Sequence, residues 1–138
     1  KKFKTLGYDP LGKNKKTKAE FREYISGFKK DWLITDAVMM PKFIAGIGNY
    51  LRAEIFYDSG IDPFCKLEDF TDQMLDALYE STHRIIKHSY KKIKADSYIN
   101  FKVYGREKCP KGNQILHIDR KGRRLWYCPN AIKFHCKK

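Results

Sequence analysis

Two helix-like patterns meet at a glycine-rich turn, and this turn constrains the fold of the chain more than any other feature. It lies within residues 43–64, which read FIAGIGNYLRAEIFYDSGIDPF. Gly46 and Gly48 permit backbone conformations that a residue with a Cβ resists, so one helix can end and another begin within a few residues. We therefore predict a second helix with Asn49 as its N-cap and Gly60 as its C-cap.

The start of this second helix is a candidate phosphate site. Its first backbone N–H groups have no acceptor within the helix, and the side-chain amide of Asn49 lies beside them. Lys42 and Arg52 could add positive charge at the same place. The alternative is purely structural, because the same glycines would also let two helices pack closely.

Positive charge is concentrated at the two ends of the chain. The 138 residues carry a formal net charge of +13, of which residues 1–18 carry +6, residues 101–138 carry +9 and the stretch between them carries −2. Clustered Lys and Arg release counterions from phosphates, so this distribution indicates a polyanionic partner. A solvated surface that only keeps the protein soluble is the alternative.

The cysteines indicate a metal site rather than a disulfide scaffold. Three of the four, Cys109, Cys128 and Cys136, lie in the last 30 residues, whereas Cys65 is expected to be an ordinary buried thiol. This pattern favours a reducing compartment. The sequence contains no run of about 18 apolar residues and no signal-peptide core at its start, so we expect no membrane segment.

We predict a mainly α fold in three parts. Residues 1–18 are rich in Lys and are expected to be a basic linker from a missing N-terminal domain. Residues 19–96 show helical periodicity, and residues 97–138 show short apolar alternations broken by Gly and Pro. The chain opens on Lys1 rather than Met, so we expect it to be a piece of a longer protein.

The longest helix is expected after residues 62–73, with apolar residues at helical spacing. Its apolar stripe consists of Met74, Leu78, Ile85 and Ile93, with Leu75, Tyr79, Ile86 and Tyr90 beside it, and we interpret these residues as core. In the last part, strands around residues 114–118 and 124–128 are joined by the polar turn DRKG. This pattern predicts a β-hairpin with Gly122 in the turn.

Together these motifs resemble the Fpg/Nei family of base-excision DNA glycosylases. GIGNYLRAEIFYDSGIDP resembles the helix-two-turns-helix signature of that family, and GNYLRAEI is nearer to the Nei-like branch. LGYDPL resembles the segment that leaves the catalytic N-terminal domain, and VYGREKCP with RRLWYCPN is similar to the terminal zinc finger. The resemblance implies the C-terminal half of such an enzyme, with a helix-two-turns-helix domain at residues 19–96 and a finger at 97–138.

The resemblance also implies residues that bind duplex DNA with a damaged or abasic nucleotide. Asn49 would contact the DNA backbone beside the damaged nucleotide, with the backbone N–H of Gly48 adding to it. Arg123, five residues before Cys128, would grip the phosphates that flank the flipped base, and Arg124 is a second candidate. Without the resemblance, two arginines on a hairpin would be interpreted as a solvated turn.

Family members attack the sugar with an N-terminal proline amine, followed by a glutamate, and then cleave the strand. No proline precedes Pro10 here, so we expect the chain alone to be inactive. The parent protein is expected to be a DNA glycosylase and AP lyase that flips oxidised bases, pyrimidines in particular, out of the stack. We expect a monomer in the nucleus or another intracellular compartment that contains DNA.

The finger departs from the family pattern at two of four zinc ligands. Cys109 and Cys128 occupy ligand positions, whereas Asn113 and Ala131 stand where the other two ligands are expected. His117 and Cys136 could replace them if the loops were rearranged, because zinc needs four N or S donors. The alternative is a zincless finger stabilised by the packing of Leu125, Trp126, Tyr127 and Phe134.

Two further functions remain open from the sequence. The chain could be a stand-alone nucleic-acid-binding module without a catalytic partner. It could also be an RNA-binding or ribosome-associated helix-two-turns-helix protein, for which a preference for structured RNA over abasic duplex DNA would be diagnostic.

Overall fold

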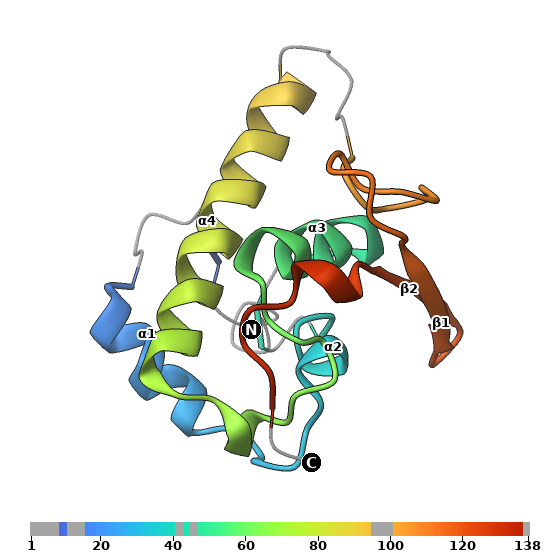
Figure 1. Cartoon of the computed structure of the whole chain (residues 1–138). Coiled ribbons are helices and arrows are strands. Elements are labelled where there is room, and N and C mark those ends of the chain that lie inside the picture. The colour runs from blue at the N-terminus through green and yellow to red at the C-terminus, as the bar shows by residue number, and fades with distance from the viewer. Residues whose placement is uncertain (1–8, 11–15, 41–42, 45–46, 95–100, 137–138) are drawn as a thin grey trace.

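The computed structural model describes residues 9–10, 16–40, 43–44, 47–94 and 101–136, and it is mainly α-helical. Its helices are α1 (Lys18–Ser26), α2 (Ile34–Ala37), α3 (Asn49–Ser59) and α4 (Asp72–Lys94), and its strands are β1 (Leu116–Arg120) and β2 (Arg123–Tyr127). Short 3₁₀ turns, η2 (Leu67–Asp69) and η3 (Pro129–Ala131), complete the described elements. Helix α3 lies between α4 and the hairpin (Figure 1). The predicted mainly α fold with a C-terminal hairpin is confirmed.

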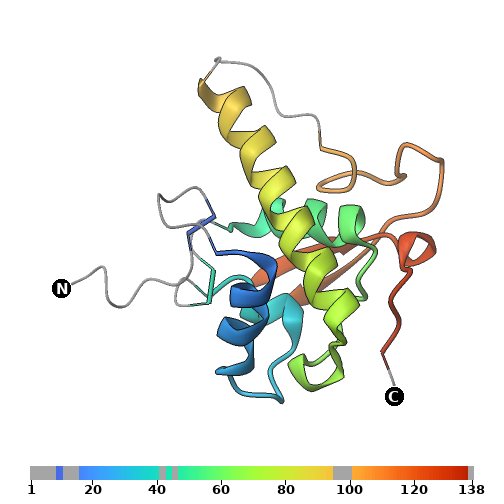
Figure 2. The same ribbon diagram turned by 90° about the vertical axis from the view of Figure 1, so that its left-hand side faces the viewer.

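Helices α1 and α4 pack against each other along their apolar faces. A capping box of Thr17 and Glu20 begins α1, because each side chain accepts a hydrogen bond from the backbone N–H of the other residue. Phe21 is fully buried beneath α4, and its ring meets Tyr79 at a centroid distance of 5.4 Å. Figure 2 shows α1 lying beside α4. The expected long helix is confirmed, with Met74, Leu78 and Ile86 buried, whereas Tyr90, which the sequence assigned to the core, is 50% exposed.

Helix α3 begins one residue earlier than the sequence predicted. Gly48 is the N-cap, at φ −97° and ψ −177°, and Asn49 is the first helical residue. The side chain of Asn49 makes no capping hydrogen bond because it reaches other partners. Gly46 lies outside the described residues, and the extended conformation of Gly48 is one that any residue can adopt. Gly60 does end the helix as predicted, in the left-handed region at φ 75°.

The hairpin is closed by a two-residue turn. Lys121 and Gly122 have φ values of 49° and 80°, as a type I′ turn requires, and Arg120 pairs with Arg123 across it. The predicted position of Gly122 is confirmed. Strand β1 starts two residues later than predicted, and strand β2 starts one residue earlier. The second strand starts earlier because this tight turn uses fewer residues than DRKG.

The hairpin is joined to the helices by two apolar clusters. Leu125 of β2 is fully buried in the main core. A smaller cluster combines α3 with the finger segment and consists of Ala53, Val103, Cys109, Ile115 and Cys128. The domain boundary predicted near residue 97 lies outside the described residues and stays a prediction.

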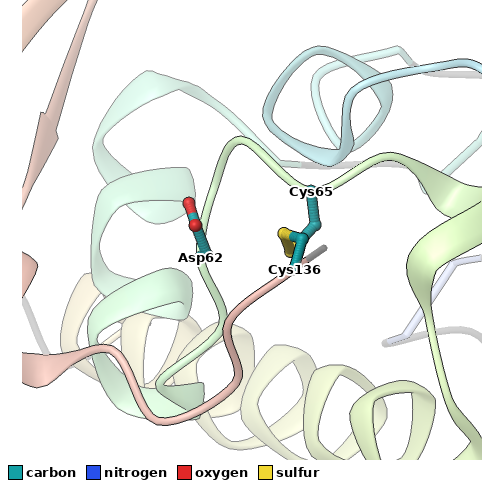
Figure 3. Close-up of side chains that lie close together, drawn as sticks. All are labelled: Asp62, Cys65 and Cys136. Carbon is teal, nitrogen blue, oxygen red and sulfur yellow. A yellow bond between two sulfur atoms is a disulfide. The ribbon is translucent and has the colours of Figure 1, made fainter. Parts of the chain in front are cut away.

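The C-terminal tail returns to the end of α3. The N–H groups of Lys133 and Phe134 both donate to the carbonyl of Gly60. A disulfide joins Cys65 to Cys136, and Asp62 lies close by (Figure 3). The sequence predicted a buried thiol at Cys65 and no disulfide, which was wrong, because 71 residues separate the two cysteines and only the tail packing brings them together.

The part of the chain that the structure describes holds no helix long and apolar enough to cross a membrane.

Candidate nucleic-acid interface

Asn49 joins the start of α3 to the hairpin. Its side-chain amide nitrogen donates to the backbone carbonyl of Arg124 at 2.8 Å, and its side-chain oxygen accepts from Nη2 of Arg52. An amide nitrogen carries two hydrogens, and the bond to Arg124 uses one of them. Asn49 therefore fixes the position of β2 and still has one donor for a ligand.

Arg52 is inside the protein rather than on a surface that faces solvent. It is 2% exposed, and its Nη1 donates to the carbonyl of Thr35 at 3.0 Å. Burial lowers the pKa of Arg52, the charges of Arg123 and Arg120 lower it further, and the carboxylate of Asp36 opposes them. Its Nε has no hydrogen-bond partner among the described residues. The geometry makes Arg52 a residue that holds Asn49, whereas the sequence suggested a phosphate ligand.

A basic cavity of about 230 Å³ opens beside these residues. It is lined by Asp36, Met39, Met40, Arg52, Arg120, Lys121 and Arg123. The carboxylate of Asp36 accepts from Arg120 and lies 4.0 Å from Nζ of Lys121. One carboxylate therefore faces four cations, and the cavity is electrostatically suited to an anion.

Asp36 and Arg120 were not singled out in the sequence, although each gave a signal. Asp36 is the only charged residue between Leu33 and Met40, a segment that is otherwise mostly apolar. Arg120 belongs to the run DRKGRR, from which only the last two arginines were selected. Their pairing could not be read from the sequence, because 84 residues separate them.

The two predicted arginines of β2 have different surroundings. Arg123 is exposed beside the turn, and no described residue forms an ion pair with it. Arg124 is committed to neighbours, because its Nε donates to Asp119 at 3.1 Å and its guanidinium lies 6.0 Å from the ring centre of Trp126. Arg123 is thus the better placed of the two for a phosphate. Lys42 lies outside the described residues.

Glu54 holds the segment after α4 against α3. Its buried carboxylate accepts hydrogen bonds from the backbone N–H groups of Lys102, Val103 and Tyr104, at 2.8, 2.8 and 3.0 Å. A buried carboxylate needs such donors, and three of them compensate for its lost hydration. Sequence reasoning missed this residue, although a lone Glu among the apolar residues of α3 is a signal.

The four predicted zinc ligands do not come together. Only Cys109 and Cys128 belong to one buried cluster, where each affects the pKa of the other. His117 lies on β1 against the ring of Trp126, at a centroid distance of 4.9 Å, and Cys136 is bonded to Cys65. The described residues hold no third His, Cys, Asp or Glu donor within 4.8 Å of both sulfur atoms. Because zinc needs four donors, the side chains present do not fit a structural zinc ion.

The thiols of Cys109 and Cys128 have pKa values that are shifted in opposite directions. Burial alone would raise the pKa of Cys109, but hydrogen bonds from the N–H of Asn113, the hydroxyl of Tyr57 and the N–H of Lys111 outweigh it and lower the pKa to about 7. Burial and the neighbouring charge of Cys109 raise the pKa of Cys128. Burial and the bond to Cys109 raise the pKa of Tyr57 to about 12.

Comparison with known proteins shows which proteins this chain resembles. No protein-family model matches the chain. The chain is 31% identical over 104 residues to the Endonuclease 8-like protein L720 of Acanthamoeba polyphaga mimivirus, a match that covers 70% of this chain and 38% of that protein. It is 34% identical over 99 residues to Endonuclease 8 of Klebsiella pneumoniae (strain 342), which covers 64% of this chain and 38% of that protein.

A solved structure has the same fold. The complex between Lactococcus lactis Fpg and DNA that contains an abasic site aligns with a TM-score of 0.77 at 23% identity, over 95% of this chain and 53% of that one. The chain belongs to the Fpg/Nei family. It corresponds to the C-terminal portion of Fpg/Nei proteins, as the motifs implied, and spans 38% of the length of both curated relatives.

Proposed function

We propose that this chain is the DNA-binding part of a base-excision-repair DNA glycosylase and grips duplex DNA around a damaged or abasic nucleotide. The observation that supports this most is the side chain of Asn49, which ties the start of α3 to β2 beside the exposed Arg123. The L. lactis Fpg with the same fold was solved with DNA that contains an abasic site. The net charge of +13 suits a polyanionic partner.

The proposed contacts divide between the helix start and the hairpin. Backbone N–H groups at the N-terminus of α3, which begins at Gly48 and Asn49, would bind one phosphate together with the remaining amide hydrogen of Asn49. The planar guanidinium of Arg123 would bind a neighbouring phosphate with two hydrogen bonds. A bound phosphate would also reduce the repulsion among Arg52, Arg120 and Arg123.

Two residues with internal partners would act as support. Arg52 orients Asn49, and Asp36 holds Arg120 at the base of the hairpin. Their role would be to present Asn49 and Arg123 at a constant separation, so that two phosphates on a kinked duplex are recognised together.

We further propose that the whole protein is a glycosylase with AP lyase activity that removes oxidised pyrimidines. The similarity of GNYLRAEI to the Nei-like branch supports this assignment, as do the relatives that are named Endonuclease 8 and Endonuclease 8-like. We also propose that residues 19–96 form a helix-two-turns-helix domain; the position of α3 directly after Gly48 and the packing of α4 against α3 support this.

The test is the affinity of the chain for a fluorescent duplex with a tetrahydrofuran abasic analogue, measured against undamaged duplex and an RNA hairpin. Arg123→Ala should weaken binding to the abasic duplex by about 10- to 100-fold, as expected for loss of a charge-assisted phosphate contact. The slope of log K against log salt should fall by about 0.9. Lys87→Ala is the matched control, because it removes one exposed positive charge from α4.

Each other result has a definite meaning. If the RNA hairpin binds more tightly than the abasic duplex, the RNA-associated alternative replaces the repair role. If Arg123→Ala and Lys87→Ala weaken binding equally, the surface attracts polyanions without a specific grip, and a phosphate site at the hairpin is excluded.

A further inference from the structure

The basic cavity beside the hairpin turn contains hydrogen-bond donors that the protein itself does not use. Nε of Arg52 and Nε of Arg120 are both buried and have no hydrogen-bond partner among the described residues. Both arginines line this cavity of about 230 Å³. An unpaired buried donor costs free energy, so an acceptor bound in the cavity would stabilise both side chains.

The other nitrogens of these two arginines are engaged by the protein. Arg52 is 2% exposed, and its terminal nitrogens donate to the carbonyl of Thr35 and to the side-chain oxygen of Asn49. Arg120 donates through Nη2 to the carboxylate of Asp36. Each guanidinium is therefore fixed in position, and its Nε–H is the donor that remains for a ligand.

The charges that line the cavity are unbalanced. Asp36 is the one carboxylate among the described lining residues, and it faces four cations, Arg52, Arg120, Lys121 and Arg123. A phosphodiester within a strand carries one negative charge, whereas a terminal phosphomonoester carries about 1.5 to 2 at pH 7. The same cations attract the additional charge, so the cavity favours the monoester.

The depth of the cavity favours the same ligand. Lys121 and Arg123 are exposed, whereas Arg52 is almost completely buried. A phosphate within a strand has a nucleoside on both sides, so we expect it to remain at the exposed Arg123. A terminal phosphate is attached through one oxygen, so its other three oxygens can enter and reach the buried nitrogens.

We propose that this cavity binds the terminal phosphomonoester of a cleaved DNA strand, whose oxygens accept hydrogen bonds from Nε of Arg52 and Nε of Arg120. The inference rests on the proposed function, because an AP lyase makes such an end. In the elimination, a base removes a proton from the sugar, the neighbouring carbon–oxygen bond breaks, and the phosphate leaves as a terminal monoester on the other fragment. The chain would thus hold the product of strand cleavage.

The experiment measures the affinity of the chain for fluorescent duplexes with a one-nucleotide gap. The gap carries a 5′-phosphate, a 3′-phosphate or hydroxyl groups alone, so the two phosphate arms distinguish the two kinds of end. We expect at least one phosphate end to bind about 10-fold more tightly than the hydroxyl ends. This preference should decrease several-fold from pH 7.5 to pH 5.5, because the second pKa of a phosphomonoester is about 6.

Two variants test the donors. Arg120→Lys keeps the positive charge beside Asp36 and removes the Nε–H, and it should lower the phosphate-to-hydroxyl affinity ratio to less than about threefold. Lys87→Ala removes an exposed charge on α4 and should leave the ratio unchanged. The ratio is taken within each variant, so a general loss of affinity for DNA cancels.

Equal affinity of the wild-type chain for phosphate and hydroxyl ends would overturn the proposal. A preference that is the same at both pH values, or that Arg120→Lys retains as fully as Lys87→Ala does, would also overturn it, because general attraction to added charge would then explain the result. The wild-type comparison needs no variant to fold. The proposed function is tested with a different pair of duplexes, intact abasic against undamaged, so its failure is distinguishable from the failure of this inference.

Discussion

The side-chain amide of Asn49 lies 2.8 Å from the backbone carbonyl of Arg124, so the first residue of α3 and the second residue of β2 are joined directly across a sequence separation of 75 residues. The same side chain accepts a hydrogen bond from the buried guanidinium of Arg52. This one residue therefore connects the start of α3, the core and the β1–β2 hairpin.

Replacing Asn49 tests that connection. Asn49→Ala removes the bond to Arg124 and leaves one nitrogen of the buried Arg52 without an acceptor. We expect the free energy of unfolding in urea to fall by about 1 to 3 kcal/mol. Asn130→Ala is the matched control, because Asn130 is exposed and its amide makes only a 3.3 Å bond to Asn113, and it should change stability by less than about 0.5 kcal/mol. Equal losses of unfolding free energy in both variants would show that the hydrogen bonds of Asn49 do not stabilise the fold.

Asp36 should contribute more to the stability of the fold than an exposed carboxylate does. Its side chain is 11% exposed and pairs with Nη2 of Arg120, whose Nε has no hydrogen-bond partner among the described residues. Asp36→Asn leaves Arg120 beside Arg52 without a counterion, and we expect a loss of about 2 to 4 kcal/mol in the free energy of unfolding. Asp119→Asn removes a carboxylate that is 70% exposed and should cost less than about 1 kcal/mol. A loss for Asp36→Asn no larger than that for Asp119→Asn would contradict the prediction.

The Cys65–Cys136 disulfide should stabilise the chain chiefly by constraining the unfolded state. It links residues 71 positions apart, for which the chain-entropy model gives a stabilisation of about 4 kcal/mol. Reduction should therefore lower the free energy of unfolding by about 2 to 4 kcal/mol, measured in urea with and without reductant. Cys136→Ser should be insensitive to reductant, whereas Cys128→Ser should respond as the wild type does. No response in the wild type would mean that the bond does not form in solution.

Acid should weaken the contact between α1 and α4. A bidentate hydrogen bond from Arg22 lowers the pKa of Asp76, with distances of 3.0 and 2.6 Å. Because the pKa is lower in the folded state than the usual value of about 3.9, the stabilisation is present above pH 4 and is lost as the pH falls through the folded-state pKa.

Urea unfolding between pH 2.5 and 6 would measure this effect. Asp76→Asn should flatten the acid side of the stability curve, while Asp31→Asn, which removes an exposed carboxylate, should leave it unchanged. An unaltered curve for Asp76→Asn would show that the pair does not govern the acid response.

The sequence by itself determined the elements whose causes are local. Helical spacing predicts α4, and the left-handed conformation of Gly60 ends α3 because a residue with a Cβ rarely adopts it. Gly122 closes the hairpin for the same reason. The resemblance of its motifs, GIGNYLRAEIFYDSGIDP above all, to those of a known family also indicated the family.

Only the tertiary structure decided which of the candidate residues act together. It buried Arg52, paired Asp36 with Arg120, and joined Cys65 to Cys136 instead of placing Cys136 in a metal site. These partners are 71 to 84 residues apart in the two pairs, and their contacts depend on how α2, the hairpin and the tail pack. Local propensity carries no information on such packing, because burial and counterion placement are set by elements that are distant in the sequence.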